Sequence, residues 1–137
     1  MSKLNLGDSL ILDTDYSTSE VKTGATWIDG KPIYSQVFEF TIPSFTAPLN
    51  PTNYLMGTIS NKKDTVSVSA IMNISGTEVN MPYFGFSNWS GSGFPITAGS
   101  RIDVNSVGGV YLLLLSNWNG IIGSVVTATV YYTKTTD

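Results

Sequence analysis

The chain has 137 residues, enough for one domain that buries its own core, and only 12% of them are charged. Seven basic and ten acidic residues are scattered along it and give a formal net charge of −3, so neither nucleic acid nor a membrane is an expected partner. Cysteine and histidine are both absent, which excludes disulfides, thiolate nucleophiles, metals held by Cys or His, and Ser-His-Asp catalysis.

Clusters of β-branched and aromatic residues, bounded by Gly, Pro, Asn and Asp, predict short strands in the first third of the chain. A strand from Ser9 to Asp13 precedes a hairpin with arms from Thr26 to Ile28 and from Lys31 to Ile42. Asp29-Gly30 between the arms is a strong signal for a two-residue turn. The second arm ends with apolar residues on alternate positions, Phe38, Phe40 and Ile42. Prolines then predict a loop from about Pro43 to Thr52.

The middle of the chain continues the same alternation of strands and turns. A strand from Tyr54 to Ser60 leads into a polar turn, Asn61 to Asp64, and then into a strand from Thr65 to Ile74. Ser75-Gly76 predicts a turn into the next strand, Thr77 to Phe86.

The last third begins with a stretch too rich in Gly and Ser for regular structure, Ser87 to Gly93, which we expect to be an exposed loop. Strands follow at Arg101 to Val104, Gly109 to Ser116 and Val126 to Tyr132. In the third of these, apolar and polar residues alternate until the final tyrosine pair, which indicates a strand with one buried face.

The run from Val110 to Leu115 is apolar at six consecutive positions. It is far too short to cross a membrane as a helix, which needs roughly 20 residues. As a strand it places apolar side chains on both faces of a sheet. Either both faces are covered within the domain or one is covered by another subunit, so a homo-oligomer is a plausible assembly.

Eight or nine short strands without a helical period predict an all-β fold. The specific expectation is a single antiparallel β-sandwich, jelly-roll-like, that forms one domain over residues 1–137.

Aromatic residues in turns are the feature most compatible with binding, because an aromatic face beside polar side chains can hold a sugar ring. The candidate contacts for a saccharide or a protein partner are aromatic residues in or near turns and the asparagines beside them: Trp89, Trp118, Tyr83, Asn88 and Asn117. The alternative is that these tryptophans belong to the core, as tryptophans in small sandwiches often do.

No sequence pattern selects a pair of catalytic carboxylates, which glycoside hydrolysis would need at roughly 5–10 Å from each other. Asp13 and Asp15 are interpreted as an acidic turn, since a calcium site needs further oxygen ligands. Phosphate-binding loops and dinucleotide fingerprints are absent as well. We therefore expect no catalytic residue, no metal and no cofactor, and a glycosidase is the least favoured hypothesis.

Two stretches at opposite ends of the chain carry a resemblance. Tyr16 to Tyr34, which contains the octet Trp-Ile-Asp-Gly-Lys-Pro-Ile-Tyr, resembles the signature YSTEE…G.WIDGKPIY of tail-fibre and minor tail structural proteins from phages and prophages of Gram-positive bacteria. Val130 to Asp137 resembles the YTKTTD ending of the same modules. The resemblance covers residues 16–137 and leaves 1–15 as a lead-in. Because each residue of the octet has a folding role, it is interpreted as a scaffold motif and not as a site.

The resemblance implies a non-enzymatic structural protein of the phage tail or baseplate that acts by contacts with other phage tail proteins. The alternative is a receptor-binding adhesin that recognises host cell-wall saccharide through exposed aromatic loops. No apolar signal-peptide stretch is found near Met1, so we expect synthesis in the host cytoplasm and assembly into the virion. In such proteins the module ends a longer fibre. Here about fifteen residues precede Tyr16, so the chain is either a stand-alone small virion protein or a fragment of a longer fibre, and the Met1 start favours the former. A trimer is the homo-oligomer that the resemblance implies, while the missing shaft argues against it because fibre trimers are held partly by their stalks.

Overall fold

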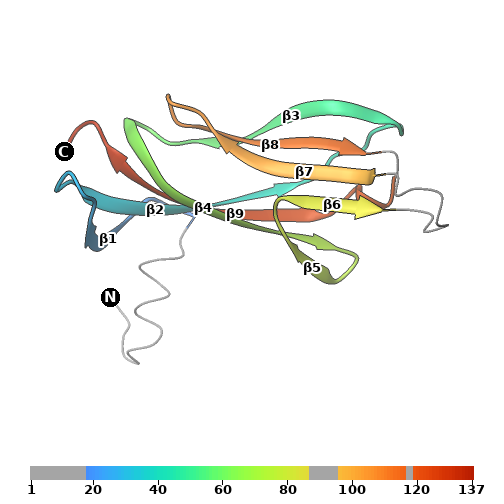
Figure 1. Ribbon diagram of the computed structural model, residues 1–137, viewed down its shortest axis with the longest axis horizontal. Coiled ribbons are helices and arrows are strands. Elements are labelled where there is room, and N and C mark those ends of the chain that lie inside the picture. Colours follow the sequence, from blue (N-terminus) through green and yellow to red (C-terminus); the bar gives the residue numbers. More distant parts are fainter. Residues whose placement is uncertain (1–17, 87–95, 117–118) are drawn as a thin grey trace.

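The computed structural model describes residues 18–86, 96–116 and 119–137, with the side chains of all but 83–86 and 96–98. Two antiparallel sheets pack face to face in it (Figure 1), which confirms the predicted all-β sandwich. The elements are β1 (Val21–Thr26), β2 (Pro32–Thr41), β3 (Leu49–Thr58), β4 (Lys62–Ile74), β5 (Thr77–Asn80), β6 (Tyr83–Phe86), β7 (Ile96–Val104), β8 (Gly109–Ser116), the short 3-10 helix η1 (Asn119–Ile121) and β9 (Val125–Lys134).

Strands from opposite ends of the chain pair with each other in both sheets. The five-stranded sheet has the order β1-β2-β9-β4-β5, and the four-stranded sheet has the order β3-β8-β7-β6. The pairing of β2 with β9 and of β3 with β8 is the jelly-roll-like feature of the fold, while β4–β5 and β6–β7 are local hairpins. The predicted strand from Ser9 to Asp13 lies outside the described residues.

The hairpin at Asp29-Gly30 forms, but its turn is longer than predicted and its first arm lies earlier. The first arm is β1, which ends at Thr26, and Trp27 and Ile28 belong to the connection. The Trp27 amide donates to the Lys31 carbonyl over 2.8 Å, and the Gly30 amide donates to the Trp27 carbonyl over 2.9 Å. With φ of 85° at Gly30, this is a three-residue loop with a glycine bulge, the next most common hairpin connection after the two-residue turns.

The loop expected from Pro43 to Thr52 is shorter in the structure, because β3 already begins at Leu49 and contains Pro51. Proline is tolerated there for two reasons. Among the described strands, β3 lies at the edge of its sheet and pairs with β8 alone, and its register shifts between Leu49 and Thr52. A proline at an edge or at an irregularity removes no ladder hydrogen bond that the sheet needs.

The stretch from Thr77 to Phe86 is two strands in different sheets and not the single strand predicted. β5 pairs with β4, and β6 pairs with β7. Met81 makes the last bond to the five-stranded sheet, from its amide to the Ala70 carbonyl over 3.1 Å. Pro82 follows, and because it has no amide hydrogen the ladder stops and the chain crosses to the other sheet.

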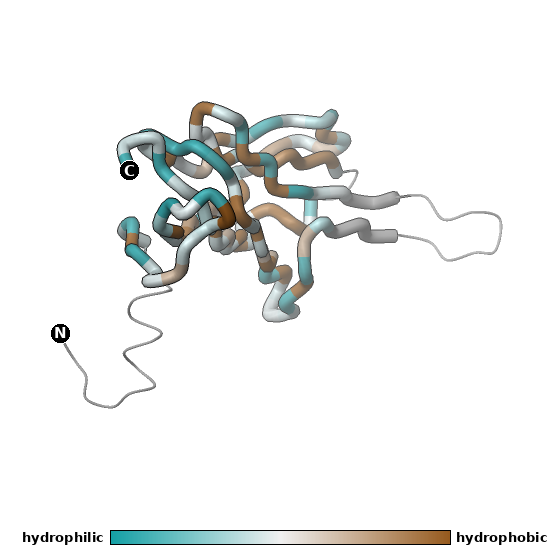
Figure 2. The backbone as a smooth tube through the Cα atoms, turned by 60° about the vertical axis from the view of Figure 1, so that its left-hand side comes forward, coloured by the Kyte–Doolittle hydropathy of each residue, from teal (hydrophilic) through white to brown (hydrophobic). Residues whose placement is uncertain are grey.

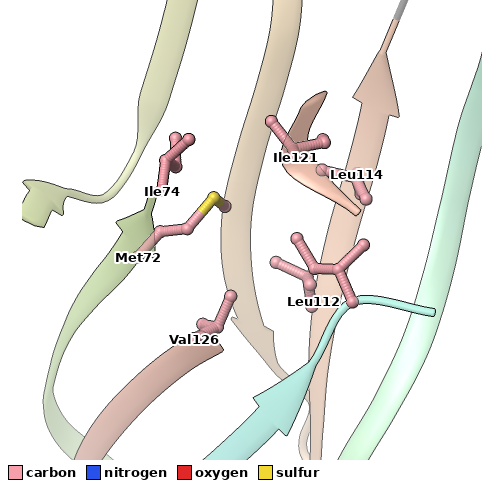
Figure 3. Packing of buried hydrophobic residues seen from close by; sticks show 7 residues of the cluster. Met72, Ile74, Leu112, Leu114, Ile121 and Val126 are labelled. Atoms are coloured by element: carbon pink, nitrogen blue, oxygen red, sulfur yellow. The ribbon is translucent and has the colours of Figure 1, made fainter. Parts of the chain in front are cut away.

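The core lies between the sheets and is built from alternate residues of the central strands. Side chains from β4, β8, β9 and η1 point toward one another in it: Met72, Ile74, Leu112, Leu114, Ile121 and Val126 (Figure 3). A second cluster nearer the C-terminal end of β9 contains Phe38, Ile59, Val110, Val130 and Tyr132. Hydrophobic and hydrophilic colours change repeatedly along the strands in Figure 2, as expected when each strand buries one face.

Ser75 and Gly76 form the predicted turn, with positive φ angles of 51° and 86°. Within the described part of the chain, no helix has the length and the apolar character needed to cross a membrane.

Candidate interaction surfaces

Four of the five residues predicted from sequence to contact a partner lie outside the described residues. These four are Asn88, Trp89, Asn117 and Trp118. Tyr83 is the first residue of β6, and its side chain lies outside what the structure describes.

The strand ends that flank these residues nevertheless come together at one end of the sandwich. Gly85 of β6 pairs with Ala98 of β7, and Ala98 pairs with Ser116 of β8. Neighbouring strands are about 4.8 Å apart, so the points where the two tryptophan-bearing stretches join the sheet are next to each other.

A polar hollow of about 330 Å³ opens between the β4–β5 turn and the chain that leads into β9. Asn73, Ser75 and Gly76 line one side, and residues 120 and 122–125 line the other. None of the described lining residues is charged, while Ile122 and Val125 give the hollow apolar surface. This chemistry suits a neutral polar ligand. The sequence predicts the Ser75-Gly76 turn, but it has no signal for the hollow, which depends on a segment almost fifty residues away.

The outer face of the four-stranded sheet carries an apolar row. In β8, Val110, Leu112 and Leu114 are buried in the core, so Tyr111, Leu113 and Leu115 point to the opposite face and are partly exposed. Leu55 of β3 pairs with Tyr111 and is 54% exposed. These four residues, Leu55, Tyr111, Leu113 and Leu115, are called the apolar row below.

The outer face of the five-stranded sheet is different in character. Its central strand β9 buries Val126, Ala128 and Val130 and turns Thr127 and Thr129 outward. Ser69 lies beside Thr129, and Glu39 and Ile71 flank Thr127. Hydroxyl groups line the middle of this face, with Ile71 and Val125 exposed beside them, so the two outer faces of the sandwich differ in chemistry.

Two further features lie beside the apolar row. On β7, the Arg101 guanidinium Nε is 3.0 Å from a carboxylate oxygen of Asp103, so the two charges neutralise each other. Beside Arg101 lies a hollow of about 140 Å³, which is lined by Pro82, Gly99, Ser100, Arg101, Leu113 and Leu115. Gly99 pairs with Leu115 and brings no side chain to fill the space. This second cavity is called the Gly99 hollow.

The two stretches that carry the family resemblance meet in space. The Tyr132 hydroxyl donates to Glu20 Oε2 over 2.6 Å, and Lys134 Nζ donates to Glu20 Oε1 over 2.7 Å. Tyr34 stacks on Tyr132 with ring centroids 6.1 Å apart, and Lys134 lies 5.3 Å from the Tyr34 ring centroid. At the chain end, Lys31 Nζ donates to the Asp137 carbonyl. The contacts of Lys31 and Tyr34 agree with the interpretation of the octet as a scaffold motif.

Tyr132 gives this cluster a pH dependence. The residue is fully buried, and burial, followed by its hydrogen bond to the Glu20 carboxylate, raises the pKa of the phenol above its ordinary value of about 10. The contribution of the buried Tyr132 phenol to the stability of the fold is complete below pH 10. Above it the unfolded chain releases a proton that folded Tyr132 retains, so the free energy of unfolding falls by up to about 1.4 kcal/mol per pH unit.

We expect Tyr132→Phe to make this alkaline decline shallower. Urea denaturation of the wild type and the variant at several pH values from neutral to strongly alkaline measures it. Equal slopes for both proteins above pH 10 would contradict the assignment.

Several described carboxylates contact a basic side chain. Asp29 accepts a hydrogen bond of 2.7 Å from Lys63, which is the main reason that the pKa of Asp29 is lowered. Asp64 lies 3.6 Å from the same ammonium, and Asp103 is paired with Arg101. Over the described ranges, no three His, Cys, Asp or Glu residues gather in a way that could hold a metal ion.

Comparisons of the chain with protein-family models, with curated proteins and with solved structures find no match.

Proposed function

We propose that this domain is a structural protein of a phage tail or baseplate that acts by protein–protein contact and has no catalytic role. The phage setting is supported by the resemblance of the two end stretches. The contact role is carried by one observation, the apolar row on the outer face of the four-stranded sheet. Contiguous Leu and Tyr side chains at the surface of a domain are typical of a surface that another protein covers.

The residues of the row are suited to this role because they contribute little to the core. Leu112 and Leu114 fill the interior, so the leucines at 113 and 115 are additional apolar surface that folding alone does not require. Polar residues at these outward positions would serve an isolated domain equally well, as Thr127 and Thr129 do on the other sheet.

The experiment is complementation of a phage that lacks this gene. We expect particles made with the wild-type chain or with Ile71→Glu to contain the protein, and particles made with Leu113→Glu to lack most of it, as measured by mass spectrometry of purified virions. Ile71 is a matched control because it lies exposed on the outer face of the other sheet. Absence of the wild-type protein from purified particles would contradict the proposal.

A second candidate, an adhesin for host cell-wall saccharide, is favoured by the polar hollow and by the adjacent strand ends that lead to Trp89 and Trp118. The same particles separate the two roles. An adhesin is indicated if particles without this protein assemble completely but no longer adsorb to cells, and a structural role is indicated if their tails are incomplete.

A further inference from the structure

The apolar row and the Gly99 hollow occupy matching positions on either side of Leu113. Leu55 lies one strand away from β8 on the β3 side, opposite Tyr111, which is two residues before Leu113. Gly99 lies one strand away on the β7 side, opposite Leu115, which is two residues after Leu113. With strands about 4.8 Å apart and a rise of about 3.3 Å per residue, the two positions are displaced from Leu113 by equal amounts in opposite directions.

This arrangement is self-complementary. We propose that the outer face of the four-stranded sheet binds a second copy of this chain about a two-fold axis that lies between the two faces and crosses Leu113. Leu55 of each copy then enters the Gly99 hollow of the other. An isologous interface requires one patch to hold both the projection and the recess that receives it, and this face has both.

The size of the hollow fits the occupant. Leu55 is 54% exposed, and the Gly99 hollow has a volume of about 140 Å³ with leucine and proline among its walls. An apolar protein cavity of about 150 Å³ accommodates a benzene molecule, so a leucine side chain fits a hollow of this size.

The charges on the face permit the same pairing. Arg101 and Asp103 are the charged side chains described on it, and they cancel within one copy. The face therefore does not repel its own copy, although the chain as a whole has a net charge of −3. Rotation about this two-fold axis places β7 of one copy over β8 of the other. Arg101 of each copy then lies within reach of Asp103 of the other copy.

The inference rests on the proposed contact role of this face and names its partner. Sedimentation velocity of the full purified chain over a wide range of concentration tests it, and we expect a species of twice the 14.8 kDa monomer mass. Leu55→Glu should weaken the dimer at least about tenfold, because it places a charge in a buried apolar pocket at the interface. Ile71→Glu, with a wild-type side chain that is 42% exposed on the other sheet, should leave it unchanged.

A charge-exchange experiment excludes misfolding as the cause of a lost dimer. Arg101→Glu gives the face two acids and Asp103→Lys gives it two bases, so each variant alone should be monomeric. An equal mixture of the two should recover the dimer mass. The proposal is overturned if the wild type stays monomeric, if Leu55→Glu and Ile71→Glu behave alike, or if the mixture remains monomeric.

These outcomes are independent of the phage experiment. A monomeric chain that Leu113→Glu still removes from virions would overturn the second-copy inference and leave the contact role standing. A chain that dimerises but is absent from virions would overturn the proposed role in the virion and leave the second-copy inference standing.

Discussion

Gly108→Ala is expected to lower the free energy of unfolding by roughly 3 kcal/mol or more. Gly108 has φ of 100°, which L side chains rarely adopt, and a Cβ there would lie 2.1 Å from the backbone oxygen of Ile59. The clash cannot be relieved by rotation of a side chain. Ile59 is buried in the core, and its amide donates to the Gly108 carbonyl over 2.8 Å, so any relief moves the link between β3 and β4.

Gly123→Ala is the matched control for this prediction. Gly123 has a similar φ of 85°, but a Cβ there meets nothing within 4 Å. Gly123→Ala should lower the free energy of unfolding only by the conformational cost of a positive φ, about 1–2 kcal/mol. Urea denaturation of the two variants measures the difference, and equal losses would show that the contact with Ile59 is unimportant.

Two neighbouring leucines should differ strongly in their contribution to stability. Leu112→Ala is expected to cost about 2–5 kcal/mol, because the side chain is fully buried and its removal leaves a cavity between the sheets. Leu113→Ala should cost under about 1 kcal/mol, because its side chain lies on the partly exposed outer face.

The comparison is made by chemical denaturation at concentrations low enough for the chain to be monomeric. Leu113→Ala should instead weaken association. Equal losses of stability for the two variants would mean that the outer face is covered within one copy, and the apolar row would then lose its role as a contact surface.

The sequence predicts the central strands well because their signal is local. In β9 the alternation from Val126 to Val130 corresponds directly to alternating burial. The run from Val110 to Leu115 correctly indicates apolar side chains on both faces of a sheet. Neither prediction depends on which strand lies beside the other.

The remaining differences arise where pairing decides the structure. Pro51 is read from the sequence as a loop residue because its edge position cannot be seen there, and Pro82 is overlooked as the point where the chain changes sheets. The bond between Tyr132 and Glu20 joins residues 112 positions apart. The Gly99 hollow depends on the register of β7 against β8. Candidate contacts chosen from the sequence as aromatic residues in turns could not include the Gly99 hollow, which exists because glycine has no side chain.

The position of β9 has a consequence for synthesis on the ribosome. β9 is synthesised after the eight other described strands, yet it lies in the middle of its sheet and supplies the partner for both β2 and β4. Until it leaves the exit tunnel, these two strands have unpaired edges and the core lacks Val126 and Val130. The five-stranded sheet is therefore expected to close only after β9 has emerged, and a chain terminated before β9 would be left for chaperones and proteases.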